Sequence, residues 1–225
     1  MKIIVVPDIH QTAHWTKVIP LADNADKIIF LGDEFDTWVN KWPDQMDNAK
    51  AIISFKKKYP DIICLCWSNH AISYYLDEQC SGYQHYHAYE IEEFYRRNQE
   101  HYSAVYCFDK WLFSHAGISS EWMTCAGIKS PDEINRLFLD RPNYFRFVGP
   151  NNFGDNRNEG PFWIRPGSLI KTAVKGYNQC VGHTESLNNP RMLKSGEDII
   201  LLIDSKDHNK IVEIDSKADG WRLIK

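Results

Sequence analysis

The sequence lacks the features that would tie it to a nucleic acid or a membrane. Basic residues are not in excess, because 26 Lys and Arg stand against 30 Asp and Glu, and the formal net charge is −4. The chain as a whole therefore does not attract a polyanion. No stretch approaches the ~20 consecutive apolar residues of a membrane span, and apolar residues 3–6 meet Pro7-Asp8 too early for a signal peptide. We expect no stable nucleic acid partner and no membrane.

The cysteines lack the pattern of a disulfide framework or a thiolate metal site. The six cysteines include no Cys-x-x-Cys pair, and the chain is longer than the small secreted scaffolds that depend on disulfides. Reduced thiols and a cytoplasmic location are therefore predicted. No internal repeat, linker or low-complexity tract divides the 225 residues, and we expect a single domain over residues 1–225.

Short apolar runs predict the order of elements. Residues 3–6, 27–31 and 61–66 have the composition of strands that are covered on both faces, as in parallel sheets. Apolar residues at helical spacing separate the second run from the third. After residue 195 three apolar runs alternate with turn formers and predict a terminal meander of strands. Together these patterns favour an α/β fold in which two packed mixed β-sheets are flanked by helices.

Chemically active residues are concentrated in five motifs, most of which follow an apolar run. The motifs are Asp8-Ile9-His10, Gly32-Asp33-Glu34-Phe35-Asp36, Ser68-Asn69-His70, Ser114-His115-Ala116-Gly117 and Gly182-His183-Thr184. Polar groups at strand ends gather at one edge of an open α/β sheet. Oxygen and nitrogen donors without a thiolate suit Mn²⁺, Fe or Zn²⁺. The five motifs therefore predict a metal-dependent hydrolytic site.

Each donor has a predicted position around two divalent ions. Pro7 extends the backbone before it, so that Asp8 and His10 project to one side and converge on a first ion. Gly32 permits a tight turn that places Asp33 at the same edge, as the carboxylate that bridges both ions. The donors of the second ion are predicted to be Asn69, His115 and His183. Paired ions activate a water molecule and neutralise phosphoryl charge.

Two residues of these motifs remain for proton transfer. The Asp36 carboxylate is placed to hold the ring of His70 in its protonated form. His70 can then donate a proton to the leaving oxygen, as a general acid.

The motifs resemble the signature of the calcineurin-like metallophosphoesterase superfamily. His115-Ala116-Gly117, and Phe162-Trp163-Ile164-Arg165-Pro166 before Gly182-His183-Thr184, are similar to the bacterial and phage branch of Ser/Thr protein phosphatases and diadenosine tetraphosphatases. The resemblance implies a β-sandwich flanked by helices, a dinuclear centre and the ligand set given above. It also implies that Arg165 clamps phosphate beside Asn69 and His70, and a guanidinium fork suits that role.

Four residues depart from the family pattern. Thr37 stands where the Ser/Thr phosphatases carry an arginine, and Ser68 and Ala71 replace a glycine and an acidic residue around Asn69-His70. Glu185 stands where many phosphodiesterases have a second histidine, which disfavours the nuclease branch. Three other arginines are candidates to replace the missing one, although solvated surface charge is the favoured interpretation: Arg141, Arg146 and Arg157. The turn-rich segment 149–161 is a candidate lid.

The leading hypothesis is hydrolysis of phosphomonoesters, on a phosphoprotein or a small molecule, at a dinuclear centre with Mn²⁺ as the favoured metal. One alternative is a dinucleoside polyphosphate hydrolase or a phosphodiesterase of the same superfamily. A second alternative is an inactive binding module that keeps the fold.

Overall fold

Two β-sheets lie face to face at the centre of the fold. The computed structural model describes residues 1–10, 13–37, 41–149, 154–206, 208–218 and 220–224. Within these residues the first sheet has the strand order β11 (Gly220–Leu223), β10 (Val212–Asp215), β1 (Lys2–Val6), β2 (Lys27–Phe30), β3 (Ile63–Cys66) and β4 (Tyr102–Ser103). The second has the order β5 (Tyr106–Phe108), β6 (Trp111–Phe113), β7 (Asn178–Val181), β9 (Asp198–Leu202) and β8 (Arg191–Ser195).

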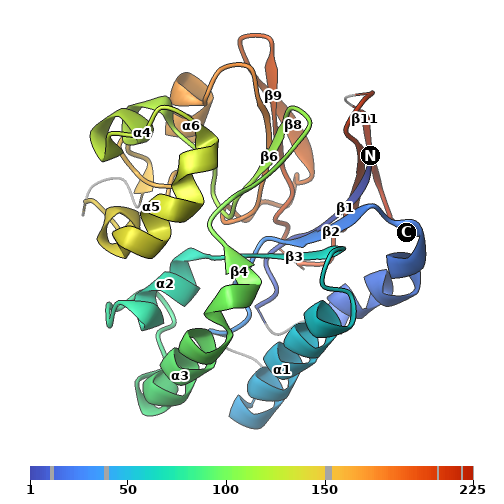
Figure 1. Cartoon of the computed structure of the whole chain (residues 1–225), viewed down its shortest axis with the longest axis vertical. Coiled ribbons are helices and arrows are strands. Elements are labelled where there is room, and N and C mark those ends of the chain that lie inside the picture. The colour runs from blue at the N-terminus through green and yellow to red at the C-terminus, as the bar shows by residue number, and fades with distance from the viewer. Residues whose placement is uncertain (11–12, 38–40, 150–153, 207, 219, 225) are drawn as a thin grey trace.

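Helices lie outside the two sheets. The α-helices are α1 (Trp42–Lys58), α2 (Asn69–Tyr75), α3 (Ala88–Asn98), α4 (Ser120–Ala126), α5 (Ile134–Asp140) and α6 (Pro166–Thr172). The 3₁₀ helices are η1 (Ala13–Asn24), η2 (His85–His87), η3 (Gln99–His101), η4 (Pro131–Glu133) and η5 (Pro142–Phe145). Figure 1 shows α1 and α3 on the outer side of the first sheet and α4, α5 and α6 gathered beside the second. This layering confirms the predicted α/β sandwich.

The continuous apolar runs of β1 and β2 follow from burial of both faces. Ile3, Val5 and Ile29 pack between the two sheets. The alternate residues, Ile4, Val6, Ile28 and Phe30, face the core beneath the helices. Burial of each such side chain contributes about 1.5–3 kcal/mol to the free energy of unfolding. The parallel pairing of β1 with β2 and of β2 with β3 agrees with the prediction from these runs.

The end of the chain is not the single meander that the sequence predicted. β8 and β9 form an antiparallel hairpin in the second sheet, whereas β10 and β11 form another hairpin in the first. β10 pairs antiparallel with β1, and Ile214 lies opposite Ile3. On the edge that does not face β2, the backbone groups of β1 need hydrogen-bond partners, and β10 supplies them.

Parallel pairing brings the ends of distant strands together. β1, β2 and β3 run parallel in the first sheet, and β6, β7 and β9 run parallel in the second. The residues that follow five of these strands are those of the predicted motifs: Asp8, Asp33, Asn69, His115 and His183. The fold therefore gathers them at the carboxyl ends of both sheets.

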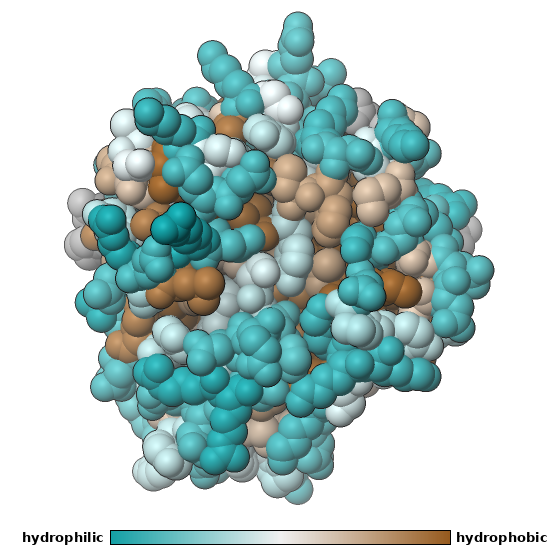
Figure 2. Space-filling model, in the orientation of Figure 1, coloured by the Kyte–Doolittle hydropathy of each residue, from teal (hydrophilic) through white to brown (hydrophobic). Residues whose placement is uncertain are grey.

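The face of the molecule seen in Figure 2 is mainly hydrophilic. Figure 2 shows that hydrophilic side chains cover most of this face and that hydrophobic ones form small separate patches. In the described part of the chain, no helix has both the length and the apolar character needed to span a bilayer.

Candidate metal centre

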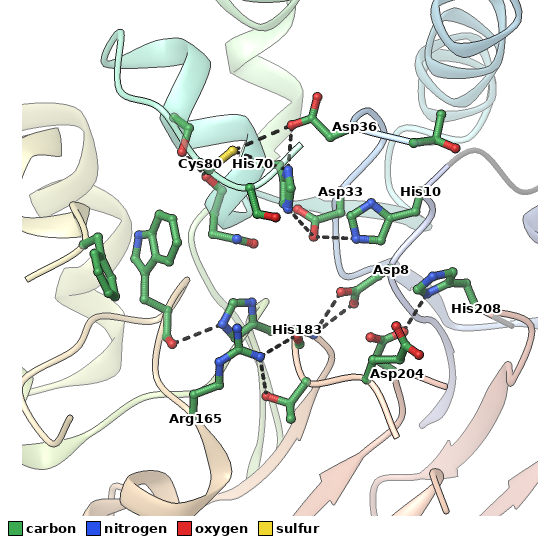
Figure 3. A pocket seen from close by; sticks show the side chains of 18 of the residues that line it. Asp8, His10, Asp33, Asp36, His70, Cys80, Arg165, His183, Asp204 and His208 are labelled. Atoms are coloured by element: carbon green, nitrogen blue, oxygen red, sulfur yellow. Dashed lines mark hydrogen bonds and ion pairs between the residues drawn. The ribbon is translucent and has the colours of Figure 1, made fainter. Parts of the chain in front are cut away.

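The strand ends open into a cavity of about 670 Å³. Asp8, His10, Asp33 and His183 line it, together with Asn69, His70, Asp36 and Arg165 from the other motifs (Figure 3). His115 is fully buried beside them, with its Nε2 3.6 Å from Asp33 Oδ2. The structure thus brings together every site residue predicted from the sequence.

The lining of the cavity is strongly acidic. Six carboxylate side chains line it: Asp8, Asp33, Asp36, Glu78, Glu185 and Asp204. Among the described lining residues Arg165 is the only arginine or lysine. Because buried carboxylates without compensating cations are costly, and because they repel phosphate, this lining fits a site that holds divalent cations.

Three histidines each present one ring nitrogen to the same centre. Nδ1 of His10 lies 3.2 Å from the carbonyl oxygen of Phe35, and Nδ1 of His115 lies 2.8 Å from that of Leu31. His183 directs Nε2 to the carbonyl oxygen of Trp163 at 3.1 Å. A carbonyl accepts only from N–H, so each ring donates there and its other nitrogen is left as a ligand atom.

Two of the free ring nitrogens face the same oxygen of Asp33, and the third faces one of those two nitrogens. Nε2 of His10 lies 3.2 Å from Asp33 Oδ2, and Nε2 of His115 lies 3.2 Å from Nδ1 of His183. Because the neutral rings of His115 and His183 each donate their one N–H to a carbonyl oxygen, the lone pairs of His115 Nε2 and His183 Nδ1 face each other. A shared cation would stabilise this arrangement. Asp33 Oδ1 and Asn69 Oδ1 are buried and have no hydrogen-bond partner. These orphaned oxygens fit the same interpretation.

The protonation of the rings matches these positions. Burial, reinforced by neighbouring imidazoles, lowers the pKa of His115 to about 4 and that of His183 well below its usual value, so both rings are neutral at neutral pH. Burial opposes ionisation of Asp33, but the facing rings of His115 and His70 outweigh it and hold the Asp33 pKa well below its usual value. Asp33 is therefore an anion that faces the neutral ring of His115, and despite burial it raises the pKa of the His10 and His70 rings that also face it.

Asp8 is held by the backbone that follows β7. The backbone N–H of His183 donates to both Asp8 carboxylate oxygens, at 3.1 and 3.0 Å. A Cβ on Gly182 would collide with Asp8 Oδ1, so that a side chain at this position would displace the carboxylate. Glycine is thus required here for close approach of the backbone.

Backbone strain is concentrated at the cavity. In the described chain, five of the seven non-glycine residues with positive φ line it: His10 (34°), Asp33 (57°), Asp36 (67°), His183 (61°) and His208 (49°). Such conformations cost on the order of 1–3 kcal/mol each and persist where the surrounding structure enforces them. Such a concentration of strained residues is typical of a functional site.

His70 and Asp36 form a nearly buried pair. The Nδ1 atom of His70 lies 2.6 Å from Asp36 Oδ2. The other oxygen of Asp36 accepts from the hydroxyl of Tyr74 at 2.5 Å and from Gln84 Nε2 at 3.1 Å. Burial opposes a charged ring, but Asp33 and Asp36 outweigh it and raise the pKa of His70 well above its usual value. The ring is therefore protonated at neutral pH, as a proton donor must be.

Arg165 is oriented by the segment that carries His183. Its Nη1 donates to the carbonyl oxygen of His183 at 3.2 Å and to Thr184 Oγ1 at 3.3 Å. Figure 3 shows its guanidinium group at the edge of the cavity, beside His183. The position suits a group that binds phosphate next to the candidate ligands.

A comparison with family models decides which family this is. The model described as calcineurin-like phosphoesterase matches residues 1–195. The chain belongs to the calcineurin-like phosphoesterases. As a member of this family it is a hydrolase of phosphoesters, and two groups of its described side chains lie close enough together to hold a metal ion: His10, Asp33 and His70, and Asp8, Asp33 and His115. The comparison with curated proteins found no match.

Solved structures share the fold of this calcineurin-like phosphoesterase. A cold-active protein-tyrosine phosphatase of a psychrophilic Shewanella species is 16% identical, with a TM-score of 0.63 over 100% of this chain and 80% of that chain. A protein serine/threonine phosphatase from Saccharomyces cerevisiae is 12% identical, with a TM-score of 0.57 over 95% of this chain and 72% of that chain. At identities this low, the similarity of the structures shows a common fold alone.

In this calcineurin-like phosphoesterase, Ser68 has a structural role of its own at the position where the family carries glycine. The Ser68 hydroxyl accepts the backbone N–H of Asp33 at 3.1 Å and that of Ala71 at 3.3 Å. The same serine therefore caps α2 and fixes the turn that carries Asp33. Gly32, at φ 106°, packs so closely on Ser68 that a Cβ there would collide with it.

The other candidate arginines lie outside the cavity. Arg146 pairs with Glu78 at 2.9 Å, Arg157 pairs with Glu121 at 3.3 Å, and Arg141 lies over the ring of Tyr144. Residues 150–153 of the candidate lid lie outside the described residues, and none of the described remainder of 149–161 lines the cavity. Phe147 and Trp163, on either side of that segment, do line it, with ring centroids 5.0 Å apart.

Asp204 and His208 are among the residues of the phosphoesterase cavity that sequence reasoning missed. Asp204 follows β9 directly, and its Oδ1 lies 2.9 Å from Nδ1 of His208, whose ring centroid is 5.0 Å from that of His10. Burial and the nearby Asp33 and Glu185 raise the pKa of Asp204 to about 7. A signal was present, since Asp204 follows an apolar run just as Asp8 and Asp33 do.

Proposed function

We propose that this chain is a metal-dependent phosphomonoesterase with two divalent ions bound around Asp33. The observation that carries the proposal is the set of three carbonyl-oriented imidazoles next to the buried Asp33 carboxylate, in a cavity that Asn69 and Arg165 also line. Asp8, His10 and Asp33 would hold the first ion; Asp33, Asn69, His115 and His183 would hold the second. Mn²⁺ is the favoured metal, because the donors are oxygen and nitrogen.

The residues of the chain divide the remaining work. Bound divalent ions supply a nucleophilic water at neutral pH and offset charge on the phosphoryl oxygens. Arg165 orients the phosphoryl group through its planar fork. His70, held in its protonated form by Asp36, donates a proton to the leaving oxygen. Phe147 and Trp163 form an apolar wall for the organic part of the ester.

Steady-state hydrolysis tests the proposal. With added Mn²⁺, 4-nitrophenyl phosphate is expected to be hydrolysed with a higher kcat/KM than bis(4-nitrophenyl) phosphate. Asp33→Asn, which keeps the shape but removes the charge, is expected to lose both bound metal and turnover. A preference for the diester would reject the monoesterase assignment, and full activity of Asp33→Asn would reject the centre.

A second candidate substrate class is the dinucleoside polyphosphates. The Phe147 and Trp163 rings favour it, because such a wall can stack on a nucleobase as well as on an aryl ring. Incubation with diadenosine tetraphosphate and chromatography of the products separates the two. Release of nucleotides at a kcat/KM above that for the aryl phosphate would make this class the substrate.

The departures from the family pattern at Ser68 and Ala71, which favour the inactive module, are compensated by other contacts. Ser68 supports Asp33 directly, and Tyr74 and Gln84 support Asp36 where Ala71 provides nothing. The predicted cytoplasmic location, the single domain and the absence of a nucleic acid partner stay predictions.

A further inference from the structure

A cysteine thiol lies against the His70–Asp36 pair. The Cys80 Sγ atom is 3.5 Å from His70 Nδ1 and 3.7 Å from Asp36 Oδ2, and those two atoms are 2.6 Å apart. Cys80 is half-buried and lines the cavity, and Figure 3 shows it beside Asp36 and His70. Thiolate, imidazole and carboxylate together are a set of donors that Zn²⁺ binds.

The separations suit a tetrahedral ion. Bonds of 2.0–2.3 Å in a tetrahedral zinc site place the ligand atoms about 3.3–3.6 Å apart. Both separations from Cys80 Sγ lie within about 0.2 Å of this range. The hydrogen-bonded atoms of His70 and Asp36 would have to separate by less than about 1 Å. All three side chains line the cavity.

The segment that carries Cys80 is anchored on both sides. The backbone N–H of Glu78 donates to the carbonyl oxygen of Ser73 at 2.7 Å, and that of Gln84 donates to the hydroxyl of Tyr74 at 2.8 Å. The ring of Tyr83 stacks on that of Tyr74, with centroids 4.4 Å apart. These contacts hold the thiol in place beside the pair.

We propose that Cys80, His70 and Asp36 form a regulatory zinc site separate from the centre around Asp33. The zinc site takes the ring nitrogen that points away from the centre around Asp33, because His70 Nε2 is the atom that faces Asp33, 4.0 Å away. Zinc on Nδ1 displaces to solvent the proton that this nitrogen shares with Asp36, and the thiol also releases its proton to solvent. The zinc-bound ring keeps a proton on Nε2, but giving up that proton would leave an imidazolate instead of a neutral imidazole. Zinc binding therefore inhibits proton donation by His70. The binding stands on these three side chains alone, whereas the inhibition rests on the proposed function.

Cobalt spectroscopy tests the binding without any need for activity. The proposed donors around Asp33 contain no sulfur, so a near-ultraviolet thiolate-to-Co²⁺ charge-transfer band reports a cysteine ligand. The Mn²⁺-loaded protein titrated with Co²⁺ is expected to develop this band, and Zn²⁺ is expected to displace it. Cys80→Ser should abolish the band, while Cys125→Ser, which alters an exposed free thiol, should keep it. Absence of the band, or its survival in Cys80→Ser, overturns the site.

Zinc titration of the Mn²⁺-loaded enzyme tests the inhibition. Cys80→Ser is expected to turn over without zinc and to need at least roughly tenfold more Zn²⁺ for half-inhibition, since loss of a ligand costs at least as much affinity as loss of its support. Zinc that instead enters the centre around Asp33 is expected to inhibit the unaltered protein and Cys80→Ser equally. Equal inhibition of the unaltered protein and of Cys80→Ser would overturn the regulatory role. A protein that shows the band but no turnover would instead overturn the proposed function.

Discussion

Replacement of His70 by asparagine should separate substrates by their leaving groups. General acid catalysis contributes about 10²–10⁴-fold, which is about 2.7–5.5 kcal/mol of barrier. The His70 ring is nearly buried and held at 2.6 Å by Asp36, which two further donors fix. We therefore expect His70→Asn to lower kcat/KM by about 10²–10⁴-fold for an alkyl phosphate, whose leaving oxygen needs a proton.

The aryl ester should be far less affected by the same change. The 4-nitrophenolate ion leaves without a proton, so His70→Asn is expected to retain most of its activity on 4-nitrophenyl phosphate. Asp36→Asn keeps the ring but removes a charge-assisted hydrogen bond of about 1.5–3 kcal/mol, and should cost the alkyl ester roughly tenfold to a hundredfold.

Parallel assays of the two esters with excess Mn²⁺ measure this effect. His85→Asn, at an exposed histidine that does not line the cavity, is the matched control. An equal loss on both esters would refute the acid role and assign His70 to binding of the phosphate or metal.

Three further changes have defined outcomes. Arg165→Lys keeps the charge but loses the planar fork, and should raise KM for the aryl phosphate by roughly tenfold or more. Gly182→Ala should displace the Asp8 carboxylate, and metal analysis of the purified protein should show less than the native metal content. Tyr95→Phe removes the hydroxyl that donates to buried Glu34 at 2.9 Å. Urea unfolding should then show a loss of about 1–3 kcal/mol, with metal content unchanged.

Each of these changes has a control in the same chain. Arg157→Lys lies outside the cavity and should leave KM unchanged. Gly220→Ala adds a Cβ that meets nothing within 4 Å and should keep the metal. Tyr89→Phe alters an exposed ring and should not change the free energy of unfolding. Equal effects in a variant and its control would contradict the corresponding role.

The positions of the candidate ligands could be predicted because they follow strands. Asp8 and Asp33 come directly after runs that are apolar on both faces, and such runs form parallel strands that end at one edge. Asp204 has the same relation to β9, but we interpreted the run before it as part of an antiparallel meander. An error in strand pairing thus hid a carboxylate of the cavity.

Other features depend on contacts that local sequence does not encode. The Cys80 thiol reaches His70 only because the segment after α2 turns back and is anchored through Tyr74 and Gln84. No periodic pattern marks that turn. The division of the last hairpins between two sheets likewise depends on long-range pairing, because β10 joins the first sheet through the edge of β1 that β2 leaves open.

Anomalous diffraction from Mn²⁺-soaked crystals tests the central claim most directly. The account predicts two manganese peaks, both within bonding distance of Asp33, one also next to His10 and the other next to His115 and His183. One peak, or none, with these side chains turned away from each other, would contradict it.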